Sequence, residues 1–241
     1  MMTRKVDLSA DLGEGSLGEE QIWPLITSAN VACGGHTGDP ESMSAAVAAA
    51  AKWKVRLGAH PSYVDRENFG RKSLDLSPIE LRMSIVLQLM ALRKVALAAG
   101  MALRHVKPHG ALYNDAHHDA GRAVTIVEAM QQVDPLLALV CPDASAMAMA
   151  ARTAGVPVIR EAFADRRYAA DGSLVPRTRA RSLLNIEEAA EQAALLVAEG
   201  VVIAEDGTRV SIAFDTICIH ADMERAVERL QAVRKRLQGV T

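Results

Sequence analysis

Seven short apolar segments in this sequence each end in a cluster of polar residues, and helix-like segments separate them. Alternating strand and helix signals are typical of parallel α/β folds, whose chemistry gathers at the carboxyl ends of the strands. A chain of 241 residues suits one α/β barrel, for which about 250 residues is typical. The pattern therefore predicts an enzyme with its site at one end of a barrel. The clusters are Asp7–Asp11, Cys33–His36, Gly58–Pro61, Val106–Gly110, Cys141–Asp143, Glu161–Arg166 and Ile219–Asp222.

Capping and turn signals place the individual elements. Asp39 and Ser77 each precede a proline and start a helix, and Asp206-Gly207 predicts a hairpin within Val201–Ala213. No linker or change in composition divides the chain, which predicts a single barrel domain over residues 1–241. The expected strands are Lys5–Ser9, Ser28–Cys33, Val55–Ala59, His105–Lys107, Leu136–Val140, Val156–Ala162 and Thr216–His220. The expected helices are Glu19–Ile26, one beginning after Asp39, Ser77–Ala99, Ala120–Gln132, Ala144–Ala154, Ile186–Glu199 and Met223–Leu237.

Composition narrows the class of partner. The formal net charge is −2 and there is no long basic block, which argues against nucleic acid or an anionic membrane as the main partner. The N-terminus has no apolar signal core, and no apolar run approaches the length of a membrane span. The cysteines Cys33, Cys141 and Cys218 are odd in number and lie at strand candidates, which favours reduced thiols and a cytoplasmic protein.

Two strand candidates carry polar residues on one face. Side chains alternate along a strand, so Asp7, Ser9 and Asp11 share a face, as do Gly58 and His60. If these faces point into the barrel, its upper interior is roomy and hydrophilic, whereas a packed barrel would contain branched aliphatic side chains there.

Four histidines follow four different strand candidates. A single histidine of this kind is more often structural, but His36, His60, His109 and His220 at equivalent strand ends favour general base catalysis or metal ligation. Asp11 with His36 and His60 is a plausible carboxylate–imidazole metal shell.

Charged residues near the other strand ends suggest anion binding. Lys107 lies at a strand tip, where an inward ammonium must pair with an acid or hold a phosphate or oxyanion. Arg71, Arg166 and Arg177 lie in long loops, and each alone is equally well explained by a loop salt bridge, whereas together they suggest an anion-binding rim.

The run from Gly13 to Gly18 formally matches the dinucleotide-binding fingerprint. We reject that interpretation because Asp11 and Glu14 would place negative charge beside a pyrophosphate. The glycines instead favour a sharp turn that aims Asp11 and Glu14 at the cleft, and a plain loop with solvated acids is the alternative.

Five ordered motifs in the chain resemble the LamB/YcsF family. Two departures are small: Ser9 stands where asparagine is usual, and Ala221 replaces the glycine of a usual His-Gly-Asp. The likeness covers about Lys5 to Leu237. The motifs are Asp7–Gly15, Ser28–Asp39, Gly58–Tyr63, Val106–Asn114 and Phe163–Arg166.

The resemblance implies a fold and an activity. The fold is a seven-stranded (β/α) barrel of the glycoside hydrolase/deacetylase-like kind. The activity is cleavage of 5-oxoproline to L-glutamate, with ATP hydrolysed to ADP and phosphate. The resemblance also implies that a member of this family performs it as the A subunit of an ATP-hydrolysing 5-oxoprolinase, together with B and C subunits. Because no Gly-x-x-x-x-Gly-Lys-Ser/Thr loop is present, any ATP must be held differently.

The residue roles expected on this basis are hypotheses. Mg²⁺, held by Glu14 with Asp11, or another divalent metal is a further expectation, a homo-oligomer is left open, and the substrate is a small molecule. The rival functions are a metal-dependent amide hydrolase or deacetylase acting alone, and a non-catalytic substrate-binding subunit. The expected catalytic residues are Asp11, His36, His60, Lys107 and His109; substrate or phosphate contacts are Glu14, Asn30, Arg71, Asp165, Arg166 and His220; and metal ligands are Asp11, His36 and His60.

Overall fold

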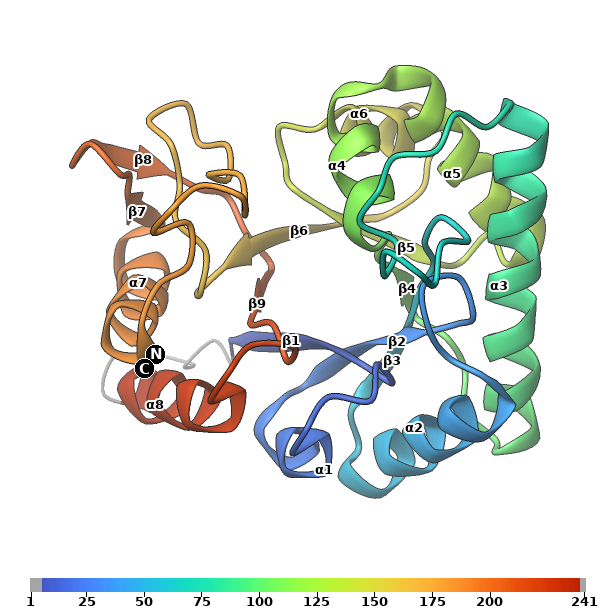
Figure 1. Cartoon of the computed structure of the whole chain (residues 1–241), viewed down its shortest axis with the longest axis horizontal. Coiled ribbons are helices and arrows are strands. Elements are labelled where there is room, and N and C mark those ends of the chain that lie inside the picture. The colour runs from blue at the N-terminus through green and yellow to red at the C-terminus, as the bar shows by residue number, and fades with distance from the viewer. Residues whose placement is uncertain (1–5, 239–241) are drawn as a thin grey trace.

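The computed structural model, which describes residues 6–238, has a closed barrel of seven parallel strands at its centre (Figure 1). Strand β9 pairs with both β6 and β1, and this closes the barrel. The predicted seven-stranded (β/α) barrel is therefore confirmed. Its strands, in spatial order, are β1 (Asp7–Leu12), β2 (Ser28–Ala32), β3 (Arg56–His60), β4 (His105–Val106), β5 (Ala138–Cys141), β6 (Val158–Phe163) and β9 (Thr216–Cys218).

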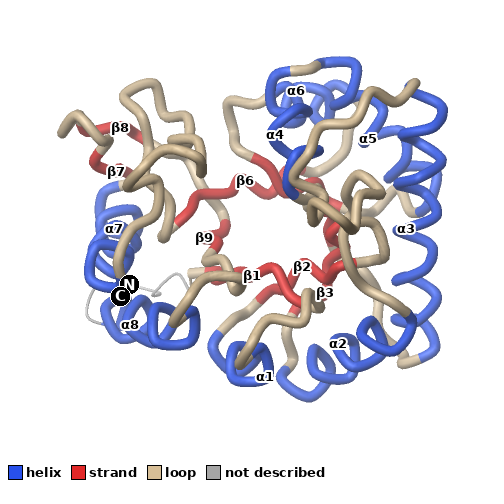
Figure 2. The backbone as a smooth tube through the Cα atoms, in the orientation of Figure 1, coloured by secondary structure: helices blue, strands red, loops and turns tan. Residues whose placement is uncertain are grey.

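Helices lie around the outside of the ring of strands (Figure 2). Asp39, Ser77 and Asn185 each form a capping box with the residue three positions later, so the predicted starts of the second and third helices are confirmed. The helices are α1 (Glu19–Ile22), the 3-10 helix η1 (Trp23–Leu25), α2 (Pro40–Trp53), α3 (Pro78–Ala98), α4 (Gly110–His118), α5 (Ala120–Val133), α6 (Ala146–Thr153), α7 (Ile186–Glu199) and α8 (Ala226–Gln238).

Several predicted boundaries differ from the structure. The first strand was expected to begin at Lys5, which lies outside the described residues, and it continues to Leu12 rather than ending at Ser9. The final helix begins at Ala226 instead of Met223. The predicted hairpin is confirmed as β7 (Val201–Ile203) and β8 (Arg209–Ser211), which pair outside the barrel.

Helix α4 was not predicted. Residues 107–109 separate it from β4, and its first residue, Gly110, has φ +57°, a left-handed conformation that favours glycine. A Cβ at Gly110 would also lie 2.5 Å from the carbonyl oxygen of Gly70. Leu112, Tyr113 and Ala116 on one side of the helix are buried, and this helical spacing is the signal that the prediction missed.

The two faces of the strands separate an apolar layer from a polar interior. On β1, Leu8, Ala10 and Leu12 belong to the apolar core, while Ser9 and Asp11 alternate with them and are also buried. The predicted hydrophilic barrel interior is therefore confirmed. Polar side chains continue to the amino end of the barrel, where a cavity of about 40 Å³ is lined by residues that include Asp7 and Thr216.

None of the helices in residues 6–238 combines the length and the apolar character needed to cross a bilayer.

Candidate active site

The carboxyl ends of β1, β3 and β4 and the adjoining loops bring a buried group of charged and imidazole side chains together. Asp11 lies on β1, His60 ends β3, and Lys107 and His109 follow β4. His36 comes from the loop after β2 and is also buried. The five residues expected to be catalytic therefore lie in one cluster, although their chemical roles stay predictions.

Lys107 is the positive centre of this cluster. Its Nζ lies 3.1 Å from each oxygen of Asp11, 2.8 Å from Glu161 Oε1 and 3.1 Å from Cys218 Sγ. Burial lowers the pKa of Lys107, but the two carboxylates outweigh it and hold this pKa well above its usual range. Burial likewise raises the pKa of Asp11, yet His60 and Lys107 keep it well below its usual range. Asp11 and Lys107 are thus a buried ion pair at neutral pH.

A buried hydrogen-bond chain from His105 through Asn30 orients Asp11. Asn30 Nδ2 donates to Asp11 Oδ1 at 2.8 Å, and His105 Nε2 lies 2.9 Å from Asn30 Oδ1. Because that amide oxygen can only accept, His105 must carry its proton on Nε2. Burial lowers the pKa of His105 to about 4, so the ring is neutral at pH 7. A Cβ at Gly58 would lie 2.1 Å from His105 Nε2, so only glycine leaves space for the ring.

His60 links the ion pair to a second group of imidazoles. Its Nδ1 lies 2.7 Å from the carbonyl oxygen of Lys107, and its Nε2 lies 3.4 Å from Asp11 Oδ2 and 3.0 Å from His109 Nδ1. Burial lowers the pKa of His60, but the neighbouring Asp11 carboxylate raises it, and the net result is a raised pKa. His60 therefore holds a proton more strongly than an ordinary histidine does.

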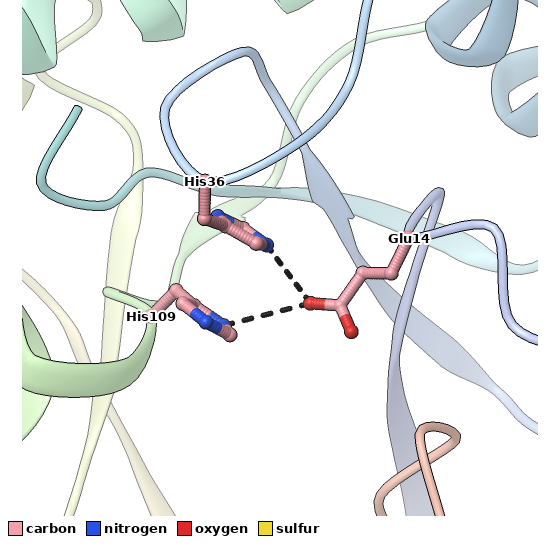
Figure 3. A group of neighbouring side chains, drawn as sticks. All are labelled: Glu14, His36 and His109. Carbon is pink, nitrogen blue, oxygen red and sulfur yellow. Dashed lines mark hydrogen bonds and ion pairs between the residues drawn. The ribbon is translucent and has the colours of Figure 1, made fainter. Parts of the chain in front are cut away.

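Glu14 faces two stacked histidine rings (Figure 3). His36 and His109 stack with centroids 3.6 Å apart and planes 4° from parallel. Glu14 Oε1 lies 3.0 Å from His36 Nε2 and 3.5 Å from His109 Nδ1. Burial raises the pKa of Glu14 to about 7 and lowers those of His36 and His109 to about 3 and about 2.

The ligand atoms of Glu14, His36 and His109 all lie within 4.8 Å of one another, which makes this group a candidate metal site. The set differs from the predicted ligands Asp11, His36 and His60 because Asp11 is occupied by Lys107 and Asn30. The sequence alone could not show which carboxylate faces the histidine pair, since Asp11 lies near the carboxyl end of β1 and Glu14 lies in the loop just after it.

The remaining predicted contacts lie on the β6 and β9 side. His220 Nδ1 lies 3.0 Å from each carboxylate oxygen of Asp165, and its backbone N–H donates to the same side chain at 2.7 Å. Burial raises the pKa of Asp165, but the charge and hydrogen bonds of His220 lower it to about 2. The His220 ring stacks on Phe163 with centroids 5.5 Å apart. Asp165 is therefore an ionised support that fixes the orientation of His220.

The predicted arginine rim is only partly present. Arg71 and Arg177, from different loops, both bind the Asp222 carboxylate. Arg166 instead is buried, and its Nη2 donates to the carbonyl oxygen of Val175 at 2.7 Å. We conclude that Arg166 holds its loop in place, and that the exposed cationic rim consists of Arg71 and Arg177.

Sequence reasoning missed three polar residues of the site. Glu161 completes the Lys107 ion pair and accepts from Tyr113 Oη at 2.7 Å; His105 orients Asn30; and Ser62 contacts His36. His105 and Lys107 alternate along the chain, as Ser9 and Asp11 do, so the same alternation argument would have found His105.

Comparisons with known proteins agree with the (β/α) barrel fold described above. The sequence profile of the LamB/YcsF family matches residues 6–241, and the chain belongs to this family. The 5-oxoprolinase A subunit of Histophilus somni (strain 129Pt) is 44% identical over 236 residues, covering 98% of this chain and 96% of the relative.

Solved structures show the same fold. The crystal structure of the lactam utilization protein from Thermus thermophilus has a TM-score of 0.92 and 42% sequence identity, and covers 98% of this chain and 97% of that one. A family 4 carbohydrate esterase from Streptomyces lividans in complex with acetate has a TM-score of 0.50 at 12% identity, covering 97% and 88% of the two chains. The second likeness concerns the barrel fold alone.

Proposed function

We propose that this chain is the A subunit of an ATP-hydrolysing 5-oxoprolinase, which opens 5-oxoproline to L-glutamate while ATP becomes ADP and phosphate. The observation that carries this proposal is the buried Asp11–Lys107–Glu161 cluster, with His60 beside it, in a chain similar over nearly its full length to proteins named as A subunits of 5-oxoprolinase. The word "subunit" in those names supports partner chains, which we propose to be the B and C subunits.

Opening of the lactam ring requires proton transfer within this buried site. A five-membered lactam is a stable amide, so phosphorylation of its oxygen creates a leaving group and an electrophilic ring carbon. Asp11 is the proposed acceptor of a proton from the attacking water because Lys107 and His60 keep it ionised at neutral pH, although the same low pKa makes it a weak base. His60, whose pKa is raised by Asp11, is suited to donate a proton to the ring nitrogen as the C–N bond breaks. A second hydrolysis then frees phosphate.

Anionic groups of the substrates need a cationic surface at the mouth. Arg71 and Arg177 share one carboxylate, that of Asp222, so this rim carries more positive than negative charge. Asp222 also lines an open groove of about 710 Å³ that reaches the first turn of α8. We propose that a carboxylate or phosphate binds at Arg71 and Arg177, and that ATP, which has no phosphate loop here, binds together with a divalent metal.

The three cysteines support a proposal about the cellular compartment. Cys33, Cys141 and Cys218 are all buried and unpaired. Free thiols are typical of a reducing compartment, so we propose a cytoplasmic protein that acts as one barrel unit.

The decisive assay measures loss of 5-oxoproline and release of ADP by the chain alone and with the co-encoded partner subunits. We expect coupled turnover only in the assembled complex, and its loss in Lys107→Met and Asp11→Asn. Full activity of either variant would remove the role assigned to that residue. Activity of the chain alone that needs a metal and ignores ATP would instead support an amide hydrolase, the alternative that the Glu14–His36–His109 grouping favours.

A further inference from the structure

The hydrogen bonds of His36 decide where its proton sits. His36 Nδ1 lies 3.0 Å from Ser62 Oγ, and the Ser62 hydroxyl donates its own hydrogen to the carbonyl oxygen of Tyr63 at 2.8 Å. Ser62 Oγ must therefore accept from His36, which places the proton of the neutral ring on Nδ1. The lone pair of His36 Nε2 then points at Glu14 Oε1, 3.0 Å away.

Hydrogen bonds also fix the positions of the protons on the His109 and His60 rings. His109 Nε2 lies 3.0 Å from the carbonyl oxygen of Phe69, so the proton is on Nε2 and the lone pair of Nδ1 faces Glu14. His60 Nδ1 donates to the carbonyl oxygen of Lys107, and its Nε2 lies 3.0 Å from His109 Nδ1, which offers only a lone pair, so His60 Nε2 carries a hydrogen too. The lone pairs of His36 Nε2 and His109 Nδ1 thus converge with the Glu14 carboxylate, and His60 stands beside them as a hydrogen-bond donor. Each opposite ring nitrogen is already bound to an oxygen, as metal-binding histidines usually are.

We propose that this space is a binding site for a transition-metal dication of the Zn²⁺, Co²⁺ or Mn²⁺ kind, with Glu14, His36 and His109 as ligands. Imidazole nitrogens select such ions over Mg²⁺ and Ca²⁺, which prefer oxygen. A tetrahedral ion with bonds of about 2.0–2.1 Å needs donor atoms about 3.3 Å apart. The observed distances from Glu14 Oε1 are 3.0 Å to His36 Nε2 and 3.5 Å to His109 Nδ1.

The surroundings of the rings constrain how they can move. Because the His36 and His109 ring planes are nearly parallel and their centroids lie 3.6 Å apart, no ion can lie in both planes, and an ion shared by both requires the rings to tilt. The His60 ring stands nearly perpendicular to both, at 89° and 87°, and approaches from a different direction. Gly70 closes the other side, because a Cβ there would lie 2.9 Å from His36 Cβ and 3.1 Å from His109 Cδ2. Gly70 therefore packs closely against both ligand histidines.

A bound ion of this class would lower the pKa of a coordinated water or polarise a carbonyl oxygen. The proposal deepens the proposed function, because the site adjoins Asp11 through His60. Its test needs no turnover, however. Metal binding can be measured on the isolated chain, and its presence or absence is independent of whether the assembled complex opens 5-oxoproline.

The experiment is a Co²⁺ titration of chelator-stripped protein followed by visible absorption, with metal content measured after Zn²⁺ loading and dialysis. We expect one ion per chain, visible absorption bands of four- or five-coordinate Co²⁺, and a rise in melting temperature with Zn²⁺ but not with Mg²⁺. His36→Ala and Glu14→Gln should each weaken binding at least 100-fold. His118→Ala is the matched control, because it breaks the only other close histidine pair among the described residues, His117–His118, and should leave the titration unchanged.

Three results would overturn the proposal: less than about a tenth of an ion per loaded chain, equal binding by wild type and by folded His36→Ala and Glu14→Gln, or loss of the ion in His118→Ala. If His36→Ala does not fold, as judged by circular dichroism, the Glu14→Gln titration decides alone. A complex that turns over 5-oxoproline although its chain binds no ion would refute the metal site and support the proposed function, whereas stoichiometric binding without turnover in the complex would do the reverse.

Discussion

The Glu14 carboxyl offers a quantitative test of the electrostatics of the site. Its pKa is raised from 4.5 to about 7, first by burial and then by Asp11 and Asp222, and the neutral His36 beside it supplies no compensating charge. The folded state therefore favours the protonated form. Below pH 4.5 Glu14 is protonated in both states, and between pH 4.5 and 7 the unfolded chain ionises first. Stability is accordingly lost as the pH rises through this window.

The size of the effect follows from the shift. Each pKa unit corresponds to about 1.36 kcal/mol, so the ionised carboxylate costs the folded state about 3 kcal/mol at pH 8. Glu14→Gln keeps the shape and removes the charge. We expect the variant to gain about 3 kcal/mol in the free energy of unfolding relative to wild type between pH 4 and pH 8. Urea denaturation of chelator-stripped protein at several pH values measures this difference.

Asp11→Asn is the internal control, because the pKa of Asp11 is shifted in the opposite direction. Its carboxylate stabilises the fold above its unfolded pKa of 3.8, so the variant should be less stable than wild type at pH 7 and approach it in acid. A Glu14→Gln difference that stays constant from pH 4 to pH 8, or that turns unfavourable at pH 8, would refute the buried-carboxyl reasoning.

Two further substitutions test the packing of the site. Lys107→Met leaves Asp11 and Glu161 buried without their cation, which typically costs about 3–5 kcal/mol at neutral pH, and urea denaturation should show a smaller loss at low pH. A loss under about 1 kcal/mol would contradict the buried ion network. Gly58→Ala forces a methyl group against His105, and overpacking of this kind costs about 1–3 kcal/mol of folding free energy. Calorimetry should therefore show a melting temperature lower by about 2–12 °C. An unchanged melting temperature would show that the His105 side chain can adopt another position.

Much of the fold could be predicted because its signals are local. Helix α7 has the predicted bounds Ile186–Glu199, and the capping residues Asp39 and Ser77 start their helices as expected. Helix α4 was missed because its signal is short and begins at a glycine, Gly110. Element boundaries shifted where neighbouring strands extend the pairing, as at Leu12, which pairs with Val31 of β2.

The residues of the candidate site were also largely predictable, but their partners were not. Strand-end position singled out Asp11, His60 and Lys107, because parallel strands place their carboxyl ends together. Strand-end position did not predict that Lys107 would form an ion pair with Glu161, or that Glu14 would contact His36 and His109. It also placed Arg166 on the rim, whereas the structure turns this side chain into its own loop.

The amino-acid sequence by itself determined the alternation of strands and helices, the polar interior of the barrel and the set of side chains that reach its mouth, since each depends on neighbours a few positions away. Only the tertiary structure decided which of those side chains carry charge and which nitrogen carries a proton. Asp11 and Lys107 are 96 residues apart in the chain, and their ionisation depends on burial and on each other's charge. Such dependence exists only after the barrel has closed around both groups.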